Sequence, residues 1–130
     1  MKRLVALCVF ASLLPLHGAE EGRLKEVMER RVALLVEIHK GLKLQFKAGS
    51  ASSNEVWAAA QELYKLRRTM AKSRAEQIKW QEELLALTKR EQEDAKARAA
   101  IGVAMPIEID LAEERVLATE QKLLELQLAK

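Results

Sequence analysis

The chain has 130 residues, of which 49% are hydrophobic, 4% aromatic and 32% charged, and its formal net charge at pH 7 is +3. A composition rich in alanine, leucine, glutamate, lysine and arginine is typical of long helices and coiled coils. Acidic and basic residues alternate along the chain, whereas a nucleic-acid surface needs a clustered basic excess, so the composition argues against nucleic-acid binding.

The first residues have the layout of a secretory signal peptide. Lys2 and Arg3 precede an apolar run that ends in small residues at Gly18 and Ala19. This run is shorter than the roughly 20 residues that a membrane-spanning helix needs. We therefore expect residues 1–19 to be a signal peptide that is cleaved after Ala19, with cleavage after Gly18 or a retained N-terminal anchor as alternatives.

Cleavage at this point changes the composition of the mature chain. It leaves 20 basic and 19 acidic residues, no transmembrane segment and no cysteine, since Cys8 is the only one. The mature protein is thus expected to be secreted across the inner membrane, with neither a disulfide nor thiolate chemistry.

The first predicted helix runs from Gly22 to about Ala48, where apolar residues recur every three or four positions. Gly49 follows at the place where a left-handed C-terminal cap is needed. Ser52 and Glu55 have the spacing of a capping box, so a second helix is expected to begin at about Ser53.

The end of the second helix is less sharply marked. We expect it to end near Lys72, with a tight turn at residues 71–73, while an unbroken helix through Trp80 is the alternative. Ser73 and Glu76 have the spacing of another capping box. The apolar stripe of the second helix consists of Val56, Ala59, Leu63, Leu66 and Met70, and the face expected after the turn consists of Ala75, Ile78, Leu85, Ala95 and Ala99.

The third helix is predicted to end near Ile101, where Gly102 repeats the role of Gly49. Pro106 suits the first turn of the next helix because it lacks an amide hydrogen, and Glu108 places a negative charge in that turn. The last helix carries one stripe of Ile109, Ala112, Val116, Thr119, Leu123 and Leu126 and a second of Leu117, Leu124 and Leu128. Two stripes predict two neighbours for this helix.

The two glycine breaks belong to an internal repeat with an offset of 53 residues. It places residues 42–70 on residues 95–123, with Gly49 on Gly102 and Glu55 on Glu108. Because short connections make successive helices antiparallel neighbours, we expect an all-α fold of elongated antiparallel helical hairpins, or a coiled-coil bundle, made of a duplicated helix, glycine turn and helix. Residues 20–72 would form the first hairpin and residues 73–130 the second, within one mature domain.

The breaks also carry a family resemblance. Residues 46–56 place an aromatic residue, Phe46, three positions before Gly49, then small and hydroxyl residues, and then the acidic and β-branched pair Glu55-Val56 before an alanine-rich helix. This pattern resembles the periplasmic helical hairpins of TolC-type outer-membrane efflux proteins. The second break keeps Gly102 and the pair Glu108-Ile109 but lacks the aromatic and hydroxyl residues, and the resemblance extends over residues 23–130.

The resemblance implies a docking or assembly role for the two turns, at Phe46, Gly49, Ser52 and Glu55 and at Gly102, Pro106 and Glu108. It implies a periplasmic location, with association at the outer membrane. It covers only the periplasmic part of such proteins, because no segment of this chain shows the alternation of a membrane strand. The chain is thus expected to be a soluble relative or a fragment of a larger efflux protein.

The sequence offers little catalytic chemistry. His39 is the only histidine left after cleavage, and no metal-ligand spacing, phosphate loop or nucleophile motif accompanies it. We therefore expect no enzyme activity, no catalytic residue, no cofactor and no metal site. Self-association or a protein partner is expected, with Trp57 near the first turn as a partner contact. A chaperone-like periplasmic binding module and a subunit that completes another protein's active site are the alternatives.

Overall fold

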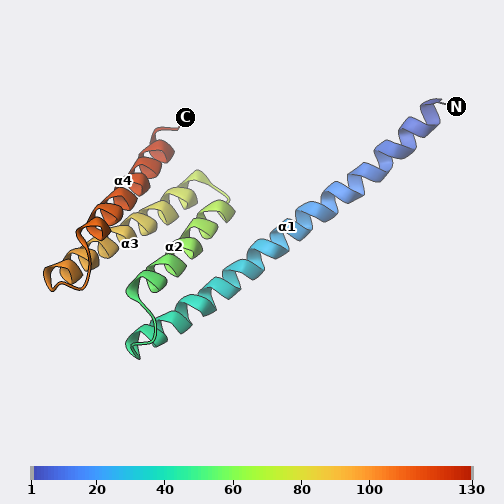
Figure 1. The fold of residues 1–130 in the computed structure, drawn as a ribbon. Helices are drawn as coiled ribbons and strands as arrows, with labels where there is room; N and C mark the ends of the chain where they lie inside the picture. Colours follow the sequence, from blue (N-terminus) through green and yellow to red (C-terminus); the bar gives the residue numbers. More distant parts are fainter. Residues whose placement is uncertain (1, 130) are drawn as a thin grey trace. The chain divides into compact units, whose positions relative to one another are not determined.

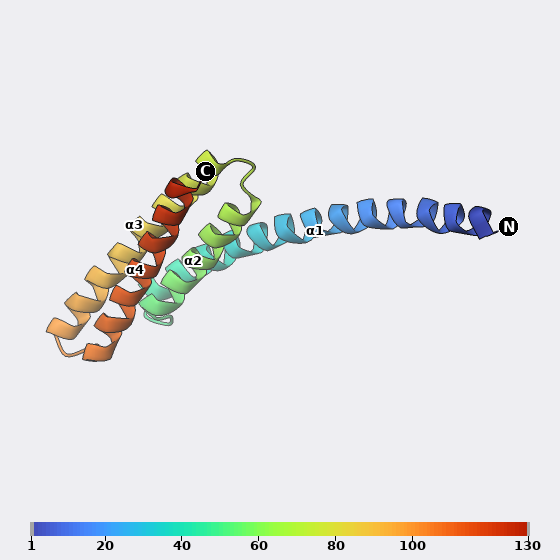
Figure 2. The ribbon, with the colours of Figure 1, turned by 90° about the horizontal axis from the view of Figure 1, so that it is seen from above.

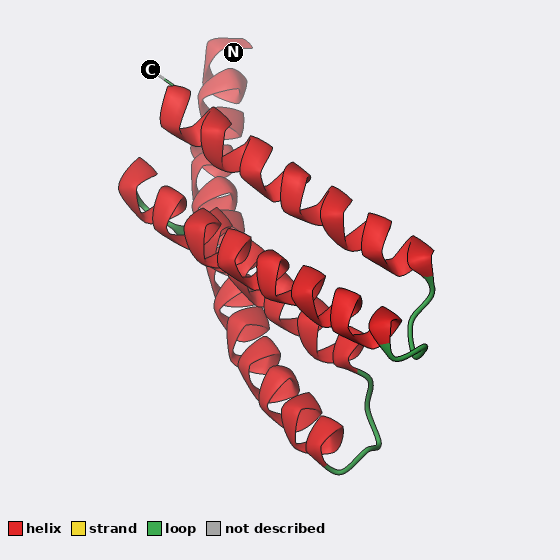
Figure 3. Cartoon of the chain, turned by 90° about the vertical axis from the view of Figure 1, so that its left-hand side faces the viewer, coloured by secondary structure: helices red, strands yellow, loops and turns green. Residues whose placement is uncertain are grey.

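A computed structural model describes the backbone of residues 2–129 and the side chains of residues 18–129. This part of the chain is helical, apart from short turns, and contains no strand. The helices are α1 (Lys2–Lys47), α2 (Ser53–Met70), α3 (Arg74–Ala100) and α4 (Pro106–Leu128), as Figure 1 and Figure 3 show. The all-α prediction is confirmed.

Helix α1 begins earlier than the predicted start near Gly22. The helix continues through Gly22, because a glycine costs a helix interior only about 1 kcal/mol relative to alanine, which is too little to end a long helix on its own. Side chains up to residue 17 lie outside the described residues, so cleavage of residues 1–19 stays a prediction.

Contacts divide the chain into two compact units between Leu34 and Leu35. The first unit contains only the earlier part of α1. The second contains the last turns of α1 together with α2, α3 and α4. The predicted hairpins of residues 20–72 and 73–130 stay a prediction.

The predicted turn between the second and third helices is present at residues 71–73. Ser73 precedes α3 in an extended conformation, and its hydroxyl accepts a hydrogen bond of 3.2 Å from the amide of Glu76. The carboxylate of Glu76 accepts a hydrogen bond of 3.0 Å from the amide of Lys72. A capping box would use the amide of Ser73, which is the next residue. The local polar residues therefore end α2 although no glycine or proline is present.

Helix α3 is the common partner of α2 and α4, and these three helices run antiparallel to their neighbours in the sequence (Figure 1, Figure 2). Burying one leucine of such a core contributes about 1.5–3 kcal/mol. The buried apolar side chains are Ala59, Ala60, Leu63 and Leu66 of α2, Leu84, Leu87 and Ala95 of α3, and Ala112, Val116 and Leu123 of α4. Part of this core comes from the predicted stripes, namely Ala59, Leu63 and Leu66 of α2 and Ala112, Val116 and Leu123 of α4.

The face predicted for α3 is wrong in part. Ala75 is exposed, and the buried face is instead centred on Leu84 and Leu87. This face also buries Gln81, Thr88 and Glu91. Three polar residues on the inner face interrupt the apolar period, which is why the hydrophobic pattern pointed elsewhere.

The second neighbour predicted for α4 is absent from the described part of the chain. Leu117, Leu124 and Leu128 are exposed, because α4 packs against α3 alone. Among the described helices, none combines the length and the apolar character needed to cross a membrane.

Candidate functional site: two glycine turns and a groove behind one of them

The first glycine turn closes α1 with a left-handed cap at Gly49, as predicted, and its hydrogen bonds are those of a Schellman motif. Gly49 has a φ angle of +79°. The amide of Ser50 donates a hydrogen bond of 2.8 Å to the carbonyl of Gln45, and the amide of Gly49 donates one of 3.0 Å to the carbonyl of Phe46. These bonds satisfy carbonyls that a helix end would otherwise leave without partners. Only a residue that tolerates positive φ fits here, which explains the glycine.

The predicted capping box opens α2. The amide of Glu55 donates a hydrogen bond of 3.2 Å to the hydroxyl of Ser52, and the amide of Ser52 donates one of 2.8 Å to the carboxylate of Glu55. Each side chain thus satisfies the other residue's backbone amide. The chain therefore enters α2 at a fixed angle immediately after the glycine.

The second turn repeats this backbone at Gly102. The φ angle of Gly102 is +78°. The amide of Val103 donates a hydrogen bond of 2.8 Å to the carbonyl of Arg98, and the amide of Gly102 donates one of 3.1 Å to the carbonyl of Ala99. The same two bonds, at the same spacing, close α3. The repeat seen in the sequence is therefore a repeat of backbone geometry.

The cap of α4 keeps only half of the capping box. Met105 stands where Ser52 stands in the first turn and makes no capping hydrogen bond through its side chain, while its amide donates 3.2 Å to the carboxylate of Glu108. Pro106 is the first residue of α4, as predicted. Arg98 lies 3.6 Å from Glu108 and 3.0 Å from Asp94, so an ion-pair chain ties the end of α3 to the start of α4.

The surfaces of the two turns differ more than their backbones. The second turn exposes Ile101, Val103, Met105 and Ile107, whose exposed fractions lie between 57 and 76%. At the first turn the exposed side chains between the glycine and the helix are Ser50 and Ser52, and Phe46 is half exposed. This apolar turn was not among the predicted features, although large apolar residues at every second position across a glycine loop were a visible signal.

Trp57 and Phe46 are brought together although they lie in different helices. Both line a hollow of about 280 Å³. The ring nitrogen of Trp57 is 3.5 Å from a carboxylate oxygen of Asp94, and the side chain packs against the buried cluster of Ala60, Leu84 and Leu87. Trp57 is therefore half buried, and its role as a partner contact stays a prediction.

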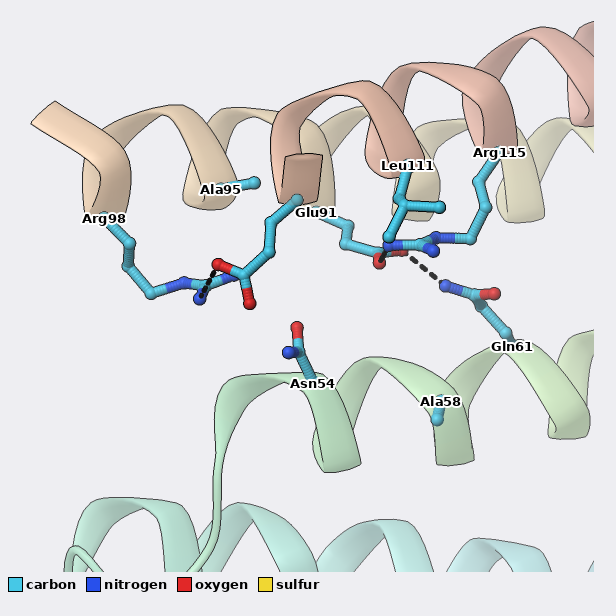
Figure 4. Close-up of a pocket in the computed structure, with 9 residues that line it drawn as sticks. Asn54, Ala58, Gln61, Glu91, Ala95, Arg98, Leu111 and Arg115 are labelled. Carbon is cyan, nitrogen blue, oxygen red and sulfur yellow. Dashed lines mark hydrogen bonds and ion pairs between the residues drawn. The ribbon is translucent and has the colours of Figure 1, made fainter. Parts of the chain in front are cut away.

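A polar groove lies behind the second turn, between α2 and α4 with α3 as its floor (Figure 4). The groove has a volume of about 320 Å³. Its centre is Glu91 of α3, which is only 4% exposed and forms an ion pair with Arg115 of α4. The other carboxylate oxygen of Glu91 accepts a hydrogen bond of 2.5 Å from the side-chain amide of Gln61 of α2. The carboxylate of Glu91 therefore connects three helices.

The groove continues into a second hollow of about 180 Å³ that shares Gln61 and Arg115 with the first. At its floor lies Gln81, whose side-chain nitrogen donates 2.9 Å to the carbonyl of Thr119. The side-chain oxygen of Gln81 accepts 2.5 Å from Arg68. Buried polar groups of this kind require partners, so Gln81 and Glu91 fix the register of the three helices.

Sequence reasoning did not identify Glu91 or Gln81. Both follow the three- and four-residue spacing of Leu84, Leu87 and Ala95, and that spacing was the available signal. A polar residue on the apolar face of a helix indicates either a polar layer or a different buried face, and only the neighbouring helices distinguish the two.

In the described part of the chain, two observations bear on metal binding and titratable groups. No group of three or more metal-ligating side chains lies within that part of the chain in a position to hold an ion. Partial burial lowers the pKa of His39, and the charge of Lys43 lowers it further.

Comparisons with protein-family models, curated proteins and solved structures find no match to this chain. The resemblance to TolC-type hairpins therefore rests on the residues of the two turns.

Proposed function

We propose that this protein is a non-enzymatic helical-hairpin protein of the cell envelope that acts by docking helices and turns against a protein surface. The observation that carries the proposal is the second glycine turn, which exposes four large apolar side chains on a hydrogen-bonded backbone. Exposed apolar clusters on soluble proteins commonly mark interaction sites. A hydrogen-bonded turn presents such a cluster without a large loss of backbone entropy on binding.

The outer face of α4 supports the same proposal. Leu117 and Leu124 are seven residues apart and lie on one face of the helix with Leu128, and all three are exposed. Glu120 and Glu125 flank this stripe. An apolar stripe with charged flanks is the pattern by which helices pair in coiled coils, so α4 has room for a helix from another chain.

The proposed location is the periplasm, with association at the outer membrane. The signal-peptide layout of residues 1–19 and the resemblance of residues 46–56 to TolC-type hairpins support it. The corresponding role is assembly of the envelope or of an efflux system by helix–helix docking, with residues 20–72 and 73–130 as its two hairpins. N-terminal sequencing of protein from a periplasmic fraction tests the location, and a mature chain that starts elsewhere than Glu20 or Ala19 would contradict the predicted cleavage.

The docking role is tested by the molar mass of the chain from Glu20, measured by light scattering together with circular dichroism. We expect a helical protein with a defined oligomeric mass. A tip variant that combines Ile101→Ser, Val103→Ser, Met105→Ser and Ile107→Ser should have a lower mass at unchanged helicity. The matched control replaces Leu24 and Leu34, which are also exposed apolar residues, with serine and should keep the mass.

A monomer would move docking to a different protein, for which a photoreactive amino acid at Val103 in cells provides the test. The expected result is a cross-link to one discrete protein partner. A monomer whose position 103 gives no cross-link would exclude the docking role of the second turn.

The exposed apolar residues favour a second candidate, a periplasmic binding module of the chaperone type. Such a module holds unfolded clients against its apolar surfaces and would prevent aggregation of a denatured model protein. It would also bind apolar dyes as a folded chain. A stable assembly with little dye binding would favour docking instead.

A further inference from the structure

The turn between α2 and α3, at the other end of these helices from the glycine turns, concentrates positive charge. Residues 65–79 contain six basic residues and one acidic residue, Glu76, although the mature chain as a whole is nearly neutral. The basic residues are Lys65, Arg67, Arg68, Lys72, Arg74 and Lys79. Concentrated charge of one sign attracts and steers anionic ligands.

Two of these cations are committed to an aromatic ring. Arg67 lies 5.0 Å and Lys79 5.9 Å from the centre of the Trp80 ring, and Tyr64 packs beside it at 5.8 Å. These cation–π contacts have a structural role. Of the other four, Lys65 and Arg68 are on α2 and line the second hollow of the groove.

The second hollow of the groove gathers cations from two helices. Lys65 and Arg68 of α2 and Arg115 and Lys122 of α4 line it, and none of its lining residues is a carboxylate. A further hollow of about 230 Å³ shares Arg68 and Lys122 and likewise has no carboxylate in its lining. Like charges brought together from separate helices repel, and an anion bound among them would offset this repulsion.

The four cations are incompletely neutralised by the protein. Lys122 makes no hydrogen bond or ion pair within the described residues, and Lys65 has an exposed partner, Glu62, at 4.0 Å. Arg68 donates to the neutral amide of Gln81. Arg115 pairs with Glu91, yet its buried Nε has no hydrogen-bond partner among the described residues.

A structural explanation covers some of these charges. Arg67 and Arg68 lie in the last turn of α2, where cations offset the negative end of the helix dipole. Lys122 lies in the interior of α4 and Arg115 is on the same helix, so the dipole accounts for neither. The ion pair with Glu91 explains Arg115, so Lys122 is the cation of α4 for which neither the dipole nor a partner among the described residues accounts.

We propose that the hollow lined by Lys65, Arg68, Arg115 and Lys122 binds a phosphate group. Guanidinium groups donate two parallel hydrogen bonds to phosphate oxygens, and lysines add compact positive charge. Gln61 and Thr119 are neutral polar residues of the same lining, and the Thr119 hydroxyl donates its hydrogen to the carbonyl of Arg115. The hollow is open to solvent at one side, so it accepts a phosphate carried by a small molecule or by the headgroup of an anionic lipid.

This site does not depend on the proposed docking function, because the docking surfaces are the second glycine turn and the outer stripe of α4. The tip variant described above should bind phosphate as the unaltered chain does. A failure of docking and a failure of phosphate binding are therefore distinguishable.

Calorimetric titration with inorganic pyrophosphate at low ionic strength tests the site in the chain from Glu20. We expect saturable binding of one equivalent per chain, weakened at least about tenfold in a variant with Lys65→Gln and Lys122→Gln. The control combines Lys40→Gln and Lys89→Gln, which removes the same charge from exposed positions outside the hollow, and should bind normally. Equal weakening in both variants, or no binding by the unaltered chain, would overturn the proposal.

Co-sedimentation with vesicles separates the two sources of the phosphate. Binding to phosphatidylcholine vesicles that contain phosphatidic acid, with loss in the Lys65→Gln and Lys122→Gln variant and competition by pyrophosphate, would assign the site to a lipid headgroup. Binding of pyrophosphate without vesicle binding would assign it to a soluble phosphate compound.

Discussion

The two glycine turns share one backbone and present two different surfaces. At Gly49 and at Gly102 the same pair of hydrogen bonds closes the preceding helix, and both glycines have φ near +80°. Serines follow the first glycine, whereas Val103 and Met105 follow the second. The geometry of a turn and its capacity to bind are therefore separate properties, since the first depends on backbone conformation and the second on the side chains it exposes.

The two turns also differ in what lies behind them. The second joins two packed helices, and the pairs Arg98–Glu108 and Glu91–Arg115 link these helices across the groove. Helix α1, before the first turn, makes no such ion pair with α2 in the part of the chain that the structure describes. The second turn should therefore be the more firmly held, and the following changes test this difference.

The largest effect is expected from Arg115→Ala. It leaves the carboxylate of Glu91 buried with only Gln61 as a partner, and we expect a loss of about 3 kcal/mol in the free energy of unfolding, as for other broken buried ion pairs. Urea denaturation of the chain from Glu20 measures it. The double variant Glu91→Leu with Arg115→Leu should recover most of the loss, and a double variant as unstable as the single one would contradict this account.

A smaller and unequal effect is expected from alanine at the two glycines. A Cβ at either position meets no atom within 4 Å, so the left-handed φ is the cause of strain. That conformation costs an L-residue roughly 1–2 kcal/mol. Gly102→Ala should lower the free energy of global unfolding by about this amount, whereas Gly49→Ala should lower it less, because α1 can fray without opening the core. Equal losses in urea denaturation would show that α1 unfolds together with the core.

Substitutions at the two helix caps should change the free energy of unfolding by about 1 kcal/mol each, in opposite directions. Ser52→Ala removes the side chain that accepts from the amide of Glu55, whereas Met105→Ser supplies the cap that the second turn lacks. Amide hydrogen exchange at the first residues of α2 and α4 measures both. Unchanged protection in α4 would mean that Glu108 and Arg98 already hold this helix start.

The smallest effect concerns pH and the helix before the first turn. Burial lowers the pKa of His39 from 6.5, so below pH 6.5 the unfolded chain binds more protons at this residue than the folded one. The contribution of His39 to stability is therefore present above pH 6.5 and decreases as the pH falls toward the folded pKa. His39→Gln should flatten the dependence of thermal stability between pH 7 and pH 5, and an unchanged slope would assign that dependence to other groups.

Several features could be predicted from the sequence because their causes lie within a few residues. A left-handed cap needs glycine, so Gly49 and Gly102 marked the helix ends. Ser52 with Glu55, and Ser73 with Glu76, marked the helix starts, and Pro106 suited the first turn of a helix. Such breaks depend on backbone sterics and local hydrogen bonds, which act in the same way in any tertiary context.

The tertiary structure decided which faces of the helices are buried. Glu91 and Gln81 lie on the inner face of α3 because Arg115, Gln61 and Thr119 reach them from α2 and α4. Leu117 and Leu124 are exposed because no other helix of the described chain covers α4. The free energy of burying a side chain depends on partners far away in the sequence, so periodicity can propose a buried face but only the packed neighbours select it.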